Sequence, residues 1–237
     1  MFTTERTFRS ALVASALAAA ALVATACTPG AGGPADGGSD SAGGAGGRPA
    51  ARGTALAAVD TLTVKGRAPK TGYEREKFGR AWEDVDRNGC GTRDDILKRD
   101  LTGVRFTDGH CKVASGTLTD DPYTGTTVRY LRGRSKVDID HIVALSDAWQ
   151  KGAGSWDAET RRRFANDPLN LLAVDASTNR RKSDGDAATW LPPNKAYRCT
   201  YVARQIAVKK KYKVWVTDGE RDAMKRVLGD CPQQKLP

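Results

Sequence analysis

The residues best suited to chemistry lie at the end of a short alternating run that starts at Val137. There, Asp140 is followed directly by His141, one of the two histidines in the chain. The alternation predicts a strand, in which neighbouring side chains point to opposite faces, so both residues can serve one site only where the strand ends or twists. The helix-like sequence from Leu145 supplies such an ending. An imidazole with an ordinary pKa of about 6.5 can take up a proton near neutral pH, and a carboxylate can bind a hard cation.

Three further polar residues follow at positions that suit the same site. Asn170 stands directly before the apolar stretch 171–174, which is a second strand candidate. Asn179 and Lys182 lie in a helical pattern that runs from Ser177 onward. The predicted order is therefore strand, strand, helix. Taken singly, an Asp-His pair is more often structural, and an Asn ahead of a helix is usually a cap.

This set of residues resembles the HNH (ββα-metal) endonuclease family in the segments Asp140-His141-Ile142, Asn170-Leu171 and Asn179-x-x-Lys182. The wider chain resembles a secreted bacterial branch of that family, which carries the motif Asp-His-Ile-Val-x-Leu. Further segments of that branch recur in the same order, so that the resemblance covers residues 72–231. They are Asp-Pro-Tyr-x-Gly from Asp121, Phe-Ala-Asn-Asp-Pro-x-Asn-Leu-Leu-Ala-Val from Phe164, and Trp-Leu-Pro-Pro from Trp190.

The resemblance implies a metal-dependent endonuclease that hydrolyses DNA and leaves 5′-phosphate and 3′-hydroxyl ends. His141 would be the general base, and Asn170 would orient it. Asp140 and Asn179 would bind Mg²⁺ or Mn²⁺. Lys182 would lie near the scissile phosphate. Asn179 stands where the best-known family pattern has a third histidine, and the zinc-binding cysteine pairs of small HNH modules are missing.

The implied fold is α+β. A ββα-metal core at about 137–185 would be embedded in additional helices and short antiparallel strands and braced by disulfides. Periodicity predicts further elements along the chain. Helices are expected over 73–86, 145–151, 158–165, 195–211 and 218–228 and from Thr92, and strands over 103–107, 126–131 and 137–143.

Charge points to the substrate class. The chain has 38 Lys and Arg against 28 Asp and Glu, a formal net charge of +10. This excess favours a polyanionic partner bound through phosphates with little sequence preference. Candidate contacts are Arg132, Arg134, Arg180 and Arg181, with solvated faces as the plain alternative. DNA is the expected partner, RNA is a further candidate, no protein partner is predicted, and a monomer is expected.

The N-terminal sequence predicts export. In residues 1–26, two arginines precede an apolar run too short to span a membrane, which is typical of a signal peptide. Cys27 follows small residues as in a bacterial lipobox and is a candidate lipidation site, with ordinary cleavage nearby as the alternative. Residues 27–54, rich in Gly and Ala, predict a flexible tether, and residues 55–237 the nuclease domain. We expect an extracellular protein, secreted or held on the outer face of the cell membrane as a lipoprotein, with that anchor as its only membrane contact.

Four cysteines remain after Cys27, and none forms a C-x-x-C pair. An even number in an exported chain predicts two disulfides. Three pairings are possible, and Cys90 with Cys111 and Cys199 with Cys231 is favoured because each closes a local loop. A zinc site is the alternative, but it would need more histidine or paired cysteine ligands.

A second metal candidate is Asp84-x-Asp86-x-Asn88-Gly89, which matches the first six positions of an EF-hand loop. Asp95 stands at the twelfth position, where the longer Glu is usual. A structural Ca²⁺ at Asp84, Asp86 and Asn88 is therefore weighed against an acidic Asx-type turn.

Two other functions compete with the nuclease. A noncatalytic, DNA-capturing surface lipoprotein would explain the anchor, the tether and the positive charge, but it does not need the Asp140, His141, Asn170 and Asn179 set. A structural envelope protein would explain export and disulfides, but it leaves the basic excess without a role. The chain has no G-x-S-x-G, H-E-x-x-H or G-x-x-x-x-G-K-[ST] motif, which argues against serine hydrolase, zincin and P-loop functions.

Overall fold

The computed structural model describes residues 51–237, which fold into helices and two small antiparallel sheets. The expected signal peptide, Cys27 and most of the expected tether lie outside the described residues. The helices are α1 (Ala55–Val59), α2 (Thr92–Asp100), α3 (Leu145–Gln150), α4 (Ala158–Asn166), α5 (Ala176–Lys182), α6 (Arg198–Tyr212) and α7 (Asp218–Gly229), with 3₁₀ turns η1 (Arg75–Phe78), η2 (Ala153–Ser155) and η3 (Lys195–Tyr197). The strands are β1 (Thr102–Phe106), β2 (Val113–Leu118), β3 (Val128–Leu131), β4 (Val137–His141) and β5 (Leu171–Asp175). The predicted α+β class is confirmed.

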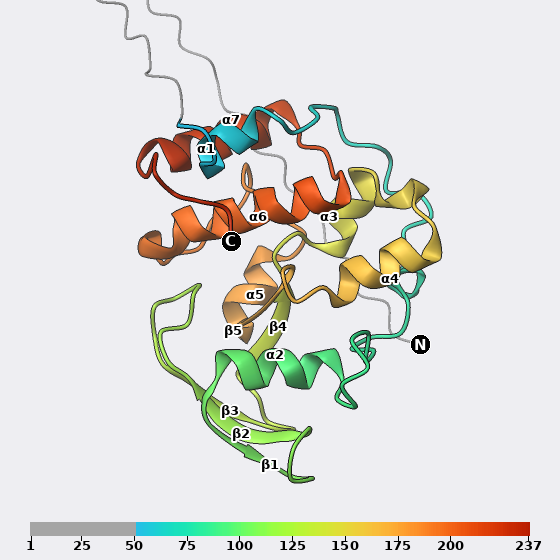
Figure 1. The fold of residues 1–237 in the computed structure, drawn as a ribbon, viewed down its shortest axis with the longest axis vertical. Coiled ribbons are helices and arrows are strands. Elements are labelled where there is room, and N and C mark those ends of the chain that lie inside the picture. Colours follow the sequence, from blue (N-terminus) through green and yellow to red (C-terminus); the bar gives the residue numbers. More distant parts are fainter. Residues whose placement is uncertain (1–50) are drawn as a thin grey trace, which may run out of the picture. The chain divides into compact units, whose positions relative to one another are not determined.

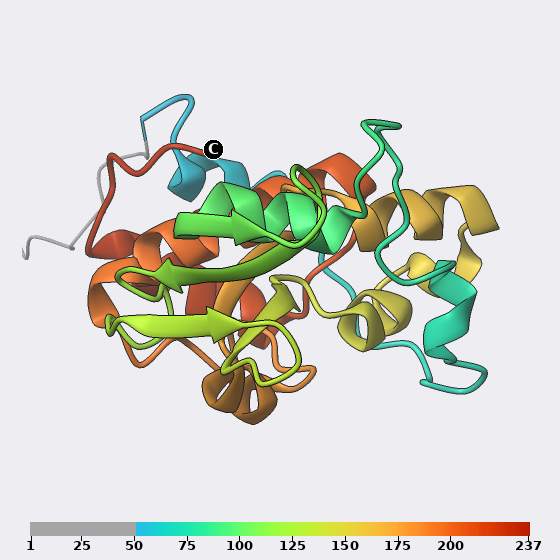
Figure 2. The same ribbon diagram turned by 90° about the horizontal axis from the view of Figure 1, so that it is seen from below.

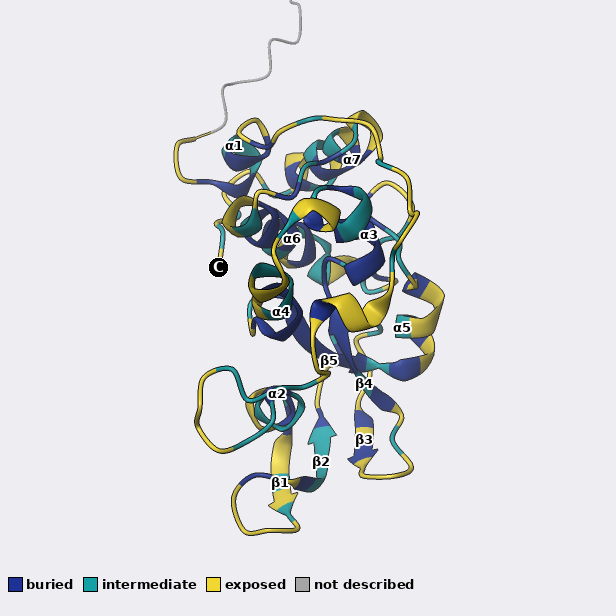
Figure 3. Ribbon diagram, turned by 90° about the vertical axis from the view of Figure 1, so that its right-hand side faces the viewer, coloured by how far each residue is buried: buried dark blue, intermediate teal, exposed yellow. Residues whose placement is uncertain are grey.

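The β4–β5 pair lies at the centre of the described fold. Helices α1, α6 and α7 cover one side of it, and α2 with the β1–β2–β3 sheet covers the other (Figures 1 and 2). Alternation in β5 matches this arrangement: Leu172 and Val174 enter the core with α6 and α7, whereas Leu171 and Ala173 enter the core with α2. Strands β4 and β5 are covered on both faces and are almost wholly buried, whereas the β1–β3 sheet has exposed residues (Figure 3). The pair is therefore a rigid platform.

A third apolar cluster joins α3, α4 and the end of α6. It includes Phe78, Phe164 and Val208, with Trp149 and Trp156 packed against it. The cluster fixes α4 beside the loop that follows β4. Among residues 51–237, no helix combines the length and apolar character needed to cross a bilayer.

The helix predicted over 73–86 does not form, apart from the short turn η1. Gly79 has a φ of 85° and Trp82 a φ of 58°, both in the left-handed region that an α-helix does not visit. Asp84 then accepts hydrogen bonds from the backbone of Asn88 and Gly89 in an Asx-type turn. Residues 66–91, here called the wall segment, therefore follow an irregular path, and most other predicted elements are found within a few residues of their expected bounds.

Both favoured disulfides are formed. Cys90–Cys111 ties the end of the wall segment to the β1–β2 hairpin, and Cys199–Cys231 ties α6 to the chain after α7. Strand β2 and helix α1 were not anticipated. Thr54, placed by sequence in the tether, is buried and caps α1, because its hydroxyl accepts from Ala57.

A network of six charged side chains, five of them buried and Arg67 exposed, joins α3, α6, α7 and the start of the wall segment. The Lys151 ammonium lies 2.7 Å from Asp147, 2.7 Å from Asp186 and 2.6 Å from Glu220. Lys209 pairs with Glu220 at 2.9 Å, and Arg67 reaches Asp147 and Asp186. Three cations face three carboxylates, so the network is neutral and each charge is compensated, as burial requires.

Candidate active site

Strand β4, strand β5 and helix α5 bring the predicted site residues together. The antiparallel register pairs Asp140 with Leu172 and His141 with Leu171, and α5 begins directly after β5, capped by Asp175. Asp140, His141 and Asn179 all border one polar cavity of about 330 Å³ at the end of β4. Strand β4 ends at His141, as the sequence required for both residues to serve one site. The predicted order of strand, strand and helix is present.

His141 is held in one orientation by a backbone carbonyl. Its side chain is almost fully buried, and Nε2 lies 2.8 Å from the carbonyl oxygen of Ala165. A carbonyl only accepts, so Nε2 carries the proton and Nδ1 retains its lone pair. Burial lowers the pKa of His141 to about 3, and the positive charges of Arg75 and Lys182 act in the same direction. The ring is therefore neutral at pH 7 and can accept a proton at Nδ1.

Asp140 is buried between two donors. The Tyr123 hydroxyl donates to Oδ2, and the Lys182 ammonium donates to Oδ1 at 3.1 Å and lies 3.0 Å from Oδ2. Burial raises the pKa of Asp140, while the hydrogen bonds and the charge of Lys182 act against this rise. Tyr123 is itself enclosed by Trp190 and Tyr201 at edge-to-face geometry. The carboxylate is thus fixed in position.

Lys182 does not occupy the place expected of it. Its side chain is 0% exposed, and its ammonium donates to Asp140 and, at 2.9 Å, to the backbone carbonyl of His141. A phosphate at the surface of the cavity would not reach it in this arrangement. The expectation of a phosphate contact is corrected to a buried ion pair that supports the end of β4.

Asn170 supports the loop that follows His141. Its side-chain oxygen accepts from the amide of Val143 at 2.9 Å, and its nitrogen donates to the carbonyls of Val143, at 3.3 Å, and Phe164, at 3.5 Å. Its own carbonyl accepts from Ile142 at 2.8 Å. Asn170 therefore joins the loop after β4 to the end of α4, the segment that supplies the Ala165 carbonyl to His141. This geometry fits the orienting role expected of it.

The oxygen donors fit a hard divalent cation. The Nδ2 group of Asn179 lies 3.5 Å from Asp138, which leaves its Oδ1 without a hydrogen-bond partner among the described residues. This carbonyl and the Asp140 carboxylate border the same cavity, and Asp184 adds a further carboxylate. Mg²⁺ typically takes one or two protein oxygens and completes its shell with water and phosphate. No cluster of three His, Cys, Asp or Glu side chains suited to a metal ion occurs within residues 51–237.

The arginines predicted to contact nucleic acid divide into two kinds. Arg132 is engaged within the fold, donating to Asp94 and to the carbonyl of Val113. Arg134 and Arg180 are exposed, Arg180 lying 3.9 Å from Asp138. Arg181 is exposed but donates to Ser177 and Thr178 within its own helix. Only some of the predicted contacts are therefore free to meet a phosphate.

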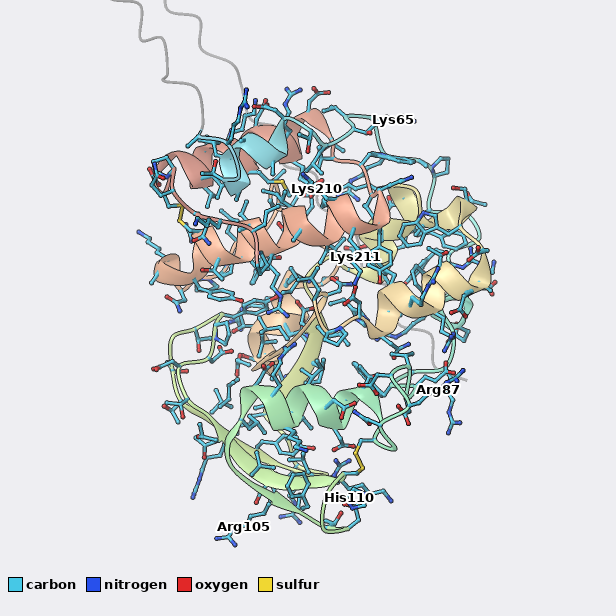
Figure 4. The ribbon with its side chains drawn as sticks, viewed as in Figure 1. Lys65, Arg87, Arg105, His110, Lys210 and Lys211 are labelled. Atoms are coloured by element: carbon cyan, nitrogen blue, oxygen red, sulfur yellow. A yellow bond between two sulfur atoms is a disulfide. The ribbon has the colours of Figure 1, made fainter. Side chains whose placement is uncertain are left out.

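The acidic loop at 84–88 is stabilised by its own hydrogen bonds. Asn88 donates from its backbone to Asp84 and Asp86 and from its side chain to Asp86 and Asp95, while its side-chain oxygen accepts from Cys90. This is the Asx-type turn of the alternative interpretation, and the Ca²⁺ site stays a prediction. His110 lies beside the Cys90–Cys111 disulfide, away from β4 (Figure 4).

Three residues at the site had no predicted role. Tyr123 lies in the Asp-Pro-Tyr-x-Gly segment that contributes to the family resemblance, but only the fold brings its hydroxyl to Asp140. The sequence predicts Trp82 as one apolar position of a helix, yet its ring stacks beside His141 with centroids 6.1 Å apart. Arg75 gave no signal in the sequence and borders the polar cavity.

The described residues thus define an α+β protein with Asp, His and Asn side chains converging at a strand–strand–helix unit. A family model described as the C-terminal domain of GmrSD restriction endonucleases matches residues 91–227, more than half of the chain, and the chain belongs to that family. An uncharacterized secreted protein of Arthroderma benhamiae is 41% identical over 180 residues, covering 75% of this chain and 85% of the relative. No solved structure matches the chain.

Proposed function

We propose that this protein is an HNH-type, metal-dependent endonuclease that hydrolyses DNA with little sequence preference. The observation that carries the proposal is the state of His141: buried, neutral and protonated at Nε2 by its bond to Ala165, beside a cavity lined by Asp140 and Asn179. A neutral imidazole with a free Nδ1 is the form that a general base requires.

In this proposal, His141 takes the proton of a water molecule that attacks the phosphorus atom. The Ala165 carbonyl stabilises the imidazolium that forms, because Nε2–H already points at it. Asp140 and Asn179 would hold Mg²⁺ or Mn²⁺, which supplies neutralisation of phosphate charge and assists departure of the 3′ oxygen when bound. Tyr123 and Lys182 keep the Asp140 carboxylate in place. Products with 5′-phosphate and 3′-hydroxyl ends would follow.

The proposed substrate and the proposed location of the protein rest on its charge, its disulfides and its similarity to known proteins. The net charge of +10 favours a polyanion, and the family is described from restriction endonucleases. Two disulfides and a relative described as secreted support work outside the cell. We propose a secreted or surface-tethered enzyme, with Cys27 as its lipid anchor.

Nicking of supercoiled plasmid by the purified protein tests this function. Cleavage is expected with Mg²⁺ or Mn²⁺, is lost with EDTA, and returns when the metal is restored in excess. The 5′ ends should resist labelling by polynucleotide kinase until phosphatase has removed their phosphate. Salt-sensitive DNA binding without cleavage in any divalent ion would instead support the DNA-capturing lipoprotein.

A further inference from the structure

A second, apolar cavity of about 450 Å³ adjoins the polar cavity of the candidate active site. Its wall includes Phe78, Trp82 and Leu145, and its volume falls within the range of small-molecule pockets. His141, Arg75 and Leu145 border both cavities, so the two meet at the imidazole. A group bound in the apolar cavity would therefore lie directly beside the proposed reaction centre.

Trp82 borders this cavity, and the Arg93 guanidinium lies over its ring, 5.6 Å from the centroid. The Trp82 ring lies nearly parallel to that of His141, with an angle of 18° between the planes and 6.1 Å between the centroids. Trp82 has a left-handed φ of 58°, an unusual conformation for a bulky residue. A Cβ atom at Gly91 would lie 3.0 Å from the Trp82 carbonyl oxygen, closer than most such contacts. The backbone is thus held in a shape that turns this ring toward His141.

Arg75 supplies positive charge at the junction of the two cavities. Its side chain is exposed, and its guanidinium has no ion-pair or hydrogen-bond partner within residues 51–237. Arg80 also borders the apolar cavity and likewise has no such partner within residues 51–237, whereas Arg162 on α4 is paired with Glu83 and Glu159. A free guanidinium beside an apolar, aromatic-lined cavity matches the chemistry of a nucleotide, which joins a flat base to an anionic phosphate.

We propose that the apolar cavity binds the unpaired base next to the scissile phosphate, with the base against Trp82 and the phosphate on Arg75. The inference rests on the proposed function and deepens it. A base within a duplex is stacked between its neighbours and cannot enter such a cavity without leaving the helix. The protein therefore prefers single-stranded or locally unpaired DNA, although it reads no sequence, because every base has a face that can stack.

Short single strands with one cleavable linkage test the base subsite. All other linkages are methylphosphonates, and the nucleotide on the 5′ or the 3′ side of the cleavable phosphate either carries its base or is abasic. For the wild-type protein, removing the base on one of the two sides should slow cleavage by at least about tenfold. Trp82→Ala should cleave the intact and abasic strands at equal rates, and Trp82→Phe, which keeps an aromatic face, should restore the difference.

Trp215→Ala is the matched control, because it removes a half-buried indole that borders neither cavity. It should discriminate between the two strands as the wild-type protein does. Equal cleavage of intact and abasic strands by the wild-type protein would overturn the base subsite and leave the nuclease standing. So would a base preference that survives in Trp82→Ala.

A protein that cleaves nothing would fail the proposed function, and binding then tests the base subsite separately. Fluorescence anisotropy of the same strands, labelled and in EDTA, should show several-fold tighter binding of the intact strand. That difference should vanish in Trp82→Ala. Equal affinities for intact and abasic strands would overturn the inference.

Discussion

Two regions line the candidate active site, and they are built by different means. The β4–β5–α5 unit is regular, with a five-pair register, a capped helix and almost complete burial. The wall segment, residues 66–91, has only the turn η1 as regular structure. It is held by long-range links instead: Arg67 to Asp147 and Asp186, Lys70 to Asp184 at 3.2 Å, and the Cys90–Cys111 disulfide.

The two regions are suited to different roles. Proton transfer and metal binding demand side chains fixed to within a fraction of an ångström, which a paired and packed platform provides. Contact with a substrate of variable sequence can be made by an irregular segment tied down at a few points. The family match begins at residue 91 and so includes β4, β5 and α5 but not Trp82 or Arg75. Changes in the two regions should therefore have different consequences.

The largest effect is expected for Asp140→Asn in the regular unit. Loss of this carboxylate should lower the cleavage rate by at least about a hundredfold, a typical loss for one group that stabilises transition-state charge. It also leaves the Lys182 ammonium buried without its counter-charge, which should cost about 3–5 kcal/mol in the free energy of unfolding. Plasmid nicking and urea denaturation measure the two losses.

Asp138→Asn is the control for stability, because Asp138 lies on the same face of β4 but is partly exposed, and its ion pair with Arg180 is long, at 3.9 Å. It should cost less than about 1 kcal/mol. Equal losses for Asp138→Asn and Asp140→Asn would mean that the buried pair is not special to the site.

Removing each disulfide in turn distinguishes its effect on the stability of the protein from its effect on the preference for single-stranded DNA. Cys90→Ser with Cys111→Ser and Cys199→Ser with Cys231→Ser remove links of similar sequence separation, 21 and 32 residues. Each pair of substitutions should lower the free energy of unfolding by about 3 kcal/mol. Only the first should also weaken the preference for single-stranded DNA, because only it releases the wall segment. A preference unchanged by the first pair would show that the other anchors hold the wall without it.

Acid should weaken the network that anchors the wall segment through Arg67. Burial raises the pKa of Asp186, but Lys151 and Arg67 outweigh it and lower the pKa from its ordinary 3.8 to about 2. A depressed pKa means that folding favours the ionised carboxylate, so this stabilisation is complete above about pH 4 and is lost as the pH falls through 2. The contribution is about 2 kcal/mol.

Unfolding of the wild-type protein and Asp186→Asn between pH 5 and pH 2 checks this prediction. The stability difference between the two proteins should stay constant down to about pH 4 and shrink as the pH falls further. A difference that stays constant over this range would mean that Asp186 does not titrate with the network.

The smallest effect is expected at the exposed arginines. Arg134→Ala should weaken DNA binding a few-fold and reduce the slope of log affinity against log salt by about 1, without affecting stability. Arg132→Ala should instead lower the stability and leave DNA binding and its salt dependence unchanged, because Arg132 is bonded to Asp94 and to the Val113 carbonyl. Anisotropy at several salt concentrations, together with thermal melting, distinguishes the two. Matching behaviour of the two variants would contradict the division.

The regular unit could be predicted from sequence because its signals are local. Alternation marks β4, the apolar run marks β5, and Asp175 starts α5 where the helical pattern begins. Lys182 was misjudged because spacing alone does not say which helix face is covered. It lies three residues after Asn179, on the face packed over β4, so its charge is buried against Asp140. Lys209 is similar, since it begins a run of three lysines yet is wholly buried in the ion network.

The wall segment could not be predicted because its shape depends on distant partners. Phe78, Trp82 and Val85 have helical spacing, but Gly79 and the turn at Asp84 break the helix. The position of Trp82 beside His141 results from contacts with residues far along the chain, which no local pattern encodes.

Plasmid nicking by His141→Ala, measured beside His110→Ala in Mg²⁺, tests the role of His141 as the general base. His110 lies in an exposed loop beside the Cys90–Cys111 disulfide (Figure 4). His141→Ala should lose at least about a hundredfold in rate while it stays folded, and His110→Ala should cleave like the wild-type protein. Cleavage by folded His141→Ala at the wild-type rate would contradict His141 as the general base.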